Sequence, residues 1–129
     1  MPTWGEIKEH ARSKYTLKSD EDDYFTLLWE YTDGRSQQIY VRHFPSYDRE
    51  WVEFRSYVCN ESELSPRVAL RKNETLSIGA LALDKDGDYF IIYSVQLATL
   101  DLEEFDLPLG AVARAADVLE LQHTAKDDY

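Results

Sequence analysis

The sequence predicts a two-layer α+β fold, in which an antiparallel five-stranded sheet packs against helices in the order α-β-β-β-α-β-β-α. Three observations predict this class: strand-like alternation over residues 24–59, two further apolar strands joined by an Asp-Gly turn over residues 76–96, and helical spacing in three other segments. The 129 residues can bury a substantial core. We therefore expect one α+β domain over residues 1–123, followed by a polar tail of residues 124–129 that frays.

A short first helix is predicted over residues 4–14. Thr3 and Glu6 have the spacing of a capping box, in which each residue satisfies a backbone N–H of the other. Ile7 and Ala11 then recur at a helical interval. We expect the acidic segment 19–23 to be a loop between this helix and the first strand.

Residues 24–59 read as three strands, and the first turn decides their register. A two-residue turn at Asp33-Gly34 would pair Leu27 with Tyr40. A three-residue loop with Gly34 in the left-handed conformation would pair Leu27 with Ile39 instead. Only this second register gathers one consistently apolar face, formed by Phe25, Leu27, Trp29, Ile39 and Val41. Because a one-residue slip would turn that set outward, we choose the three-residue loop.

The opposite face of these strands is aromatic but also charged. Its candidate partner-binding residues are Tyr40, Phe44, Trp51 and Tyr57, and the charged residues among them are Glu30, Arg42, Glu53 and Arg55. Aromatic and Arg side chains are enriched at binding surfaces, so the mixture favours an interface over a dry core. Three interpretations stay open: cover by the protein's own helices or cross-strand packing, a dimer or client surface, and a groove for a small ligand.

The second half begins with a predicted helix over residues 64–72, where Ser65 is the cap and Pro66 occupies the first helical position. Strands are expected at about residues 77–83 and 88–96. Both are apolar on alternate and on intervening positions, so we expect both faces to be covered around Leu81, Phe90 and Ile92.

The last helix is predicted over residues 108–121, after a short turn. Asp101 and Glu104 have capping spacing, but Pro108 would interrupt a helix that began there. The expected buried stripe consists of Leu109, Val112, Ala116 and Leu119.

Composition bounds the partners and the compartment. The formal charge of −11, from 25 acidic and 14 basic residues, disfavours a nucleic-acid phosphate backbone as partner. Cys59 is the only cysteine, so no internal disulfide can form, which fits a reducing compartment. The sequence has neither the apolar core of a signal peptide nor a run long enough to span a membrane. We therefore expect a cytoplasmic protein that acts without membrane or nucleic acid.

No reaction centre is predicted. The acidic segment 84–88 lacks the glycine and glutamate positions of an EF-hand loop, so an acidic β-turn is favoured over a calcium site. His10, His43 and His123 lie on different elements without metal-ligand spacing. His43 could meet Cys59 across the sheet as half of a thiol nucleophile pair, although a lone strand Cys usually acts as a small apolar residue. We expect no catalytic residue, no metal and no cofactor, and hence no enzyme.

The element order and several short motifs resemble the secretion-chaperone-like fold. This fold is shared by type III secretion chaperones of the Tir-chaperone (CesT) class and by YbjN-like proteins. The local motifs are most similar to the YbjN-like group, and they are residues 70–73, GALALD at 79–84, YSV at 93–95 and VARAADVLE at 112–120. They are apolar and structural, and they cover only the second half of the chain.

The resemblance implies a small, acidic, cytoplasmic bacterial protein, commonly a homodimer, that binds other polypeptides without catalysis. Such dimers carry apolar patches around which extended client segments wrap. The corresponding hypothesis is a chaperone-like protein-binding module. The alternative, suggested by the charge alone, is an acidic inhibitor or immunity protein that blocks a basic enzyme.

Overall fold

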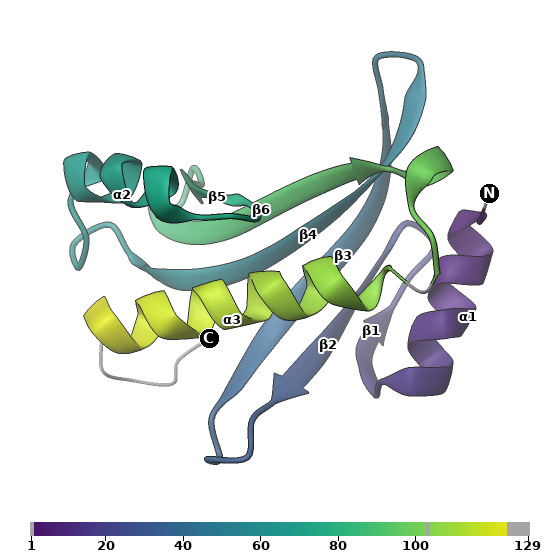
Figure 1. Ribbon diagram of the computed structural model, residues 1–129, viewed down its shortest axis with the longest axis horizontal. Coiled ribbons are helices and arrows are strands. Elements are labelled where there is room, and N and C mark those ends of the chain that lie inside the picture. The colour runs from purple at the N-terminus through teal and green to yellow at the C-terminus, as the bar shows by residue number, and fades with distance from the viewer. Residues whose placement is uncertain (1, 103, 124–129) are drawn as a thin grey trace.

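The computed structural model describes residues 2–102 and 104–123, which form one six-stranded antiparallel sheet with helices packed on one side (Figure 1). The strands lie in the order β1-β2-β3-β4-β6-β5. The elements are α1 (Trp4–Lys14), β1 (Leu17–Asp20), β2 (Tyr24–Glu30), β3 (Ser36–Ser46), β4 (Arg49–Asn60), α2 (Pro66–Lys72), η1 (Asn73–Thr75), β5 (Ala80–Leu83), β6 (Asp88–Gln96), η2 (Leu97–Thr99) and α3 (Asp106–His123). The α+β class and the two layers are confirmed.

Helix α1 starts at the predicted capping box. The Thr3 hydroxyl accepts from the Glu6 amide at 3.1 Å, and the Glu6 carboxylate accepts from the Thr3 amide at 3.1 Å. Ile7 and Ala11 are fully buried against the sheet. The helix is therefore held by its cap at one end and by two apolar side chains along its inner face.

The prediction of five strands was wrong by one, because β1 occupies part of the segment expected to be a loop. Its Asp20 pairs with Phe25 of β2. The carboxylate of Asp20 also binds two side chains of α1, Lys8 at 3.0 Å and Arg12 at 2.7 Å. These ion pairs connect the polar end of the edge strand to α1. The hydrogen bonds from Arg12 and then from Lys8 lower the pKa of Asp20 to about 2.

Strands β2 and β3 adopt the predicted register. Phe25 pairs with Val41 and Leu27 pairs with Ile39. Gly34 has a φ of 89°, which lies in the left-handed region that a side chain would disfavour. The three-residue loop is confirmed, and burial of one apolar face explains why this register is the stable one.

The β3–β4 hairpin extends beyond the rest of the sheet at the top of the view in Figure 1. Its tight turn places Tyr47 at φ 52° and Asp48 at φ 59°. The indole N–H of Trp51 donates to the Ser46 carbonyl at 2.8 Å and supports this turn. The projecting hairpin thus carries an ordered turn and not a loose loop.

Helix α2 begins at Pro66, and the hydroxyl of its cap Ser65 accepts from the Val68 amide at 3.3 Å, as predicted. Asn73 follows the helix and lies beside the edge strand β5. Its side-chain carbonyl accepts from the Leu81 amide at 2.6 Å, and its side-chain amide donates to the Leu81 carbonyl at 3.4 Å. The side chain of Asn73 therefore satisfies both the N–H and the C=O of Leu81, which point away from β6.

Helix α3 runs across the sheet, in contact with β3, β4 and β6 (Figure 1). It begins two residues before Pro108, which sits in the first turn, where its missing N–H costs no helical hydrogen bond. Arg35, at the β2–β3 turn, binds the helix through Asp117 at 3.0 Å and through the fully buried Glu120 at 3.0 Å. This cluster fixes the end of the β2–β3 hairpin against α3.

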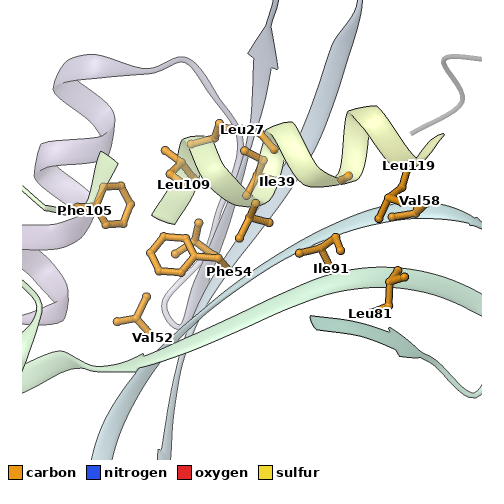
Figure 2. Packing of buried hydrophobic residues seen from close by; sticks show 14 of the residues in the cluster. Leu27, Ile39, Val52, Phe54, Val58, Leu81, Ile91, Phe105, Leu109 and Leu119 are labelled. Atoms are coloured by element: carbon orange, nitrogen blue, oxygen red, sulfur yellow. The ribbon is translucent and has the colours of Figure 1, made fainter. Parts of the chain in front are cut away.

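The apolar core lies between the helices and one face of the sheet, as Figure 2 shows. Phe54 is at its centre, with its ring 5.4 Å from that of Phe105. The predicted stripe of α3 is buried there, at Leu109, Val112, Ala116 and Leu119. None of the described helices is both long and apolar enough to cross a bilayer.

The expectation that helices cover both faces around Leu81, Phe90 and Ile92 was wrong. Leu81 lies on the helix-covered face, but Phe90 and Ile92 point to the other side of β6, where they neighbour Tyr57 and Arg55 of β4. Among the described residues, that side carries no helix. Phe90 is nevertheless buried, because neighbouring side chains of the sheet lie over it.

Candidate partner-binding face of the sheet

The four predicted partner-binding residues lie on the sheet face that no described helix covers, which we call the open face. Strand pairing places Tyr40 opposite Arg55, and Phe44 opposite Trp51. Tyr57 follows on the same side of β4, two residues beyond Arg55. The sequence prediction that these aromatics share one side of β3 and β4 agrees with this pairing. Their role in binding stays a prediction.

The aromatic residues form two groups and not one cluster. At one end, the Tyr40 and Tyr57 rings meet edge to face at 5.7 Å, and Tyr57 lies 5.5 Å from Phe90. At the other end, Phe44 pairs with Trp51 at the base of the projecting hairpin. Edge-to-face contacts of this kind add to the stability gained from burial alone.

An ion-pair cluster separates the two aromatic groups. Glu53, only 3% exposed, accepts two hydrogen bonds from Arg42, at 3.0 and 3.1 Å, and one from Arg55 at 3.2 Å. The same guanidinium groups lie over aromatic rings, Arg42 over Phe44 at 4.4 Å and Arg55 over Phe90 at 3.9 Å. Each cation is thus held between a carboxylate and a ring, which fixes the side chains in place.

A shallow hollow of about 340 Å³ lies on this face, and its lining residues are Tyr24, Tyr40, Arg42, Glu53, Arg55 and Tyr57. It contains donors, acceptors and ring faces. Burial raises the pKa of Tyr40, and the neighbouring Tyr57 and Tyr24 act in the same direction. The Tyr40 hydroxyl therefore stays protonated at physiological pH, and it can donate or accept a hydrogen bond.

Sequence reasoning did not place Phe90 and Ile92 on the open face. They belong there because β6 pairs with β4, so that Phe90 faces Tyr57 and Ile92 faces Arg55. Their alternation with buried Ile91 was visible in the sequence. The pairing of β4 with β6 was not visible in the sequence, because α2 and β5 lie between these two strands along the chain.

The residues considered for chemistry lie apart from one another. His43 pairs with Val52 near the hairpin, and its Nε2 lies 3.1 Å from the Glu50 carboxylate, whereas Cys59 pairs with Tyr89 at the far end of β4. His43 and Cys59 therefore do not meet across the sheet, which agrees with the interpretation of Cys59 as a small apolar residue. Burial raises the pKa of the Cys59 thiol to about 11, so it is protonated at neutral pH and a weak nucleophile.

The acidic segment 84–88 forms the predicted turn between β5 and β6. The Asp84 carboxylate accepts from the amides of Asp86 at 3.0 Å and Asp88 at 2.9 Å. These hydrogen bonds, that of Asp88 first, lower the pKa of Asp84. Within residues 2–102 and 104–123, no group of three or more His, Cys, Asp or Glu side chains is arranged to hold a metal ion.

Comparison with solved structures identifies the fold. One chain of the ExsC–ExsE complex is similar to this chain, with a TM-score of 0.66 and 15% identity, over 95% of this chain and 97% of that one. One chain of the HopA1–SchA chaperone–effector complex is similar with a TM-score of 0.58 and 13% identity, over 88% and 89% of the two chains. No protein-family model and no curated protein matches the sequence.

The chain therefore has a secretion-chaperone-like fold, and the fold resemblance seen in the sequence is confirmed. The similarity extends over nearly the whole chain at low identity, so it establishes architecture and not a partner. The narrower likeness to YbjN-like proteins stays a prediction.

Proposed function

We propose that this chain is a noncatalytic, chaperone-like module of the cytoplasm that binds another polypeptide, or a second copy of itself, through the open face. The observation that carries the proposal is this face itself: two aromatic groups, on either side of an ion-pair cluster around the buried Glu53, lie on a side of the sheet without a described helix. Ordered aromatic and Arg side chains lose little conformational entropy on binding and are the commonest anchors of protein interfaces. The fold shared with chains of chaperone–effector complexes supports the same class of function.

The first experiment separates a binding role from a folding role. Trp51→Ser and Tyr57→Ser are compared with Leu70→Ser, a matched change at an exposed apolar residue of α2. Light scattering should give about twice the chain mass of 15.1 kDa for the wild type and for Leu70→Ser. We expect the two open-face variants to dissociate or to lose partners in a pull-down, because interface aromatics contribute about 2 kcal/mol each to the free energy of binding. Their melting temperatures by circular dichroism should stay within a few degrees of the wild type.

A core role for these aromatics predicts a different result. Melting temperatures would then fall steeply in Trp51→Ser and Tyr57→Ser, and any loss of binding would follow the unfolded fraction. A wild type that stays monomeric on concentration, and whose captured partners are unchanged by both substitutions, would contradict the proposal.

The second candidate function is an acidic inhibitor that blocks a basic enzyme, which the net charge of −11 favours. Salt separates the two functions once a partner has been captured. Association with an electrostatically steered target slows steeply as ionic strength rises, whereas association through an apolar and aromatic surface changes little. A stopped-flow series from about 50 to 500 mM NaCl measures this directly.

A further inference from the structure

Helix α3 is apolar on two sides, and only one of them is buried in the core. The second side consists of Leu107, Ala111, Ala115 and Val118, which recur at the spacing of one helical face. Leu107 is 67% exposed and Val118 is 36% exposed. The core therefore leaves the two ends of this stripe exposed, at Leu107 and Val118, whereas Ala111 and Ala115 between them are half-buried and Ala115 packs against the core.

The stripe forms one wall of a groove on the helix-covered side of the sheet. The other wall is the extended segment after η1, with Leu76 and Ile78, and the enclosed volume is about 440 Å³. A second hollow of about 320 Å³ shares Ile78 and continues to Leu107 and Pro108. Together they follow α3 for about four turns, or roughly 20 Å.

The floor and the small side chains of the groove suit the close approach of another helix. Tyr93 and Val95 of β6 line the continuation of the groove beneath Ile78. Ala111 and Ala115 project only a methyl group each, which lets a second helix lie at the short interaxial distances of about 8–10 Å found in packed helices. An extended segment fits less well, because the backbone of α3 is already hydrogen-bonded within the helix and could not satisfy a strand.

The charge on the rim selects the kind of helix. Lys72 and Arg114 line the larger hollow, and none of the described residues that line it is acidic. Glu104 lines the smaller hollow, so the basic part of the rim lies at the end of the groove near the C-terminus of α3. The chain as a whole has 25 acidic and 14 basic residues, so this locally basic rim departs from its surroundings. Lys72 also reaches Gln122 at 3.5 Å, which places its charge at the end of the groove near the C-terminus of α3.

We propose that this groove binds an amphipathic helix of a partner protein, with apolar side chains at i, i+4 and i+7 against α3 and with carboxylates beside Lys72 and Arg114. The site lies on the opposite side of the sheet from the open face and does not rest on the function proposed for that face. It gives the chain a second docking surface that is selective for acidic helices.

Two synthetic peptides of about 16 residues test the proposal, both with leucines at helical spacing, one with Glu and one with Lys at the flanking positions. Fluorescence anisotropy with the full chain measures their affinities. We expect micromolar binding of the Glu peptide and binding of the Lys peptide at least tenfold weaker. Ala115→Trp should fill the groove and weaken the Glu peptide at least tenfold, whereas Leu121→Trp, on the same helix but outside the groove, should change nothing.

A charge reversal checks the selectivity. Arg114→Glu should lose the preference for the Glu peptide or invert it, while the control Arg71→Glu, which does not line the groove, keeps it. Circular dichroism melts confirm that all variants fold. Failure of both peptides to bind, equal affinity for both, or unchanged binding to Ala115→Trp would each overturn the proposal.

Two further outcomes would also overturn the proposal, because they would show either that the peptide binds outside the groove or that the groove has another occupant. Loss of peptide binding in Trp51→Ser would place the peptide on the open face. Dissociation of a wild-type dimer by Ala115→Trp would show that a second copy, and not a partner helix, occupies the groove.

Discussion

The two faces of the sheet use the same strands but exclude water in different ways. On the helix-covered face, Phe54 is fully buried among apolar side chains and packs on Phe105 of the segment before α3. On the open face, Phe90 is buried under the Arg55 guanidinium and beside Tyr57. A ring can thus be buried by a packed layer or by the side chains of its own sheet.

The largest effect should come from a matched pair of substitutions, one on each face. Phe54→Ala should lower the free energy of unfolding by about 3–5 kcal/mol, because the packed layer cannot collapse into the cavity. Phe90→Ala should cost about 2 kcal/mol, close to the transfer contribution of the ring alone, since Arg55 and Tyr57 can move into the space. Urea denaturation measures both values, provided that the slope of the unfolding free energy against urea concentration is the same in the variants and the wild type. Equal losses would mean that the open face is packed as tightly as the core.

A second pair compares the ion-pair clusters at the two faces. Arg35→Met removes the cation that binds Asp117 and the fully buried Glu120, and should cost about 3 kcal/mol, because buried carboxylates lose their compensating charge. Arg42→Met should cost about 1 kcal/mol or less, since Arg42 is half exposed and Arg55 still binds Glu53 at 3.2 Å. Thermal melts of both variants give the order. A larger loss for Arg42→Met would reverse the comparison.

The smallest effect concerns Asp106, at the edge of the helix-covered side where α1 meets α3. Burial acts to raise its pKa, but hydrogen bonds from Lys14 at 2.7 Å and Tyr15 at 2.5 Å outweigh it, so the pKa lies below 3.8. Above the ordinary Asp pKa of 3.8, which applies to the unfolded chain, the carboxylate therefore contributes its full stabilisation. This contribution is lost as the pH falls through the lower pKa that Asp106 has in the folded protein.

The corresponding variant is Asp106→Asn. At pH 6 it should be less stable than the wild type by an amount on the order of 0.5–1 kcal/mol, since Lys14 is half exposed and solvent screens the pair. The difference should close as the pH drops below 3.8. A gap that widens under acid would mean that Asp106 is not the group responsible.

Local patterns were enough to predict most of the elements and one register. The capping box at Thr3, the cap at Ser65 and the left-handed Gly34 each specify a backbone hydrogen bond or a φ value within a few residues. The shared side of Tyr40 and Tyr57 followed from the period of two along β3 and β4. These features could be predicted because their physical cause lies within the segment itself.

The features that were missed depend on distant parts of the chain. Strand β1 has a single apolar residue that packs against the core, Leu17, and its other contacts are its pairing with β2 and the ion pairs of Asp20 with α1, so its own sequence carries no strand pattern. Similarly, Phe90 and Ile92 are apolar at positions where a helix was expected to cover them. Phe90 is covered by Arg55 of β4 instead, and no local pattern in the sequence specifies that β4 pairs with β6.

The amide of Asn73 has a consequence for how the molecule behaves in concentrated solution. A sheet ends in backbone groups that can template a strand from another molecule, the first step towards fibrils. At Leu81 the Asn73 side chain already makes the two backbone hydrogen bonds that a seventh strand, added beside β5, would otherwise make. Growth of the sheet past β5 must first displace this side chain. One residue just after a helix therefore acts against uncontrolled polymerisation at that edge.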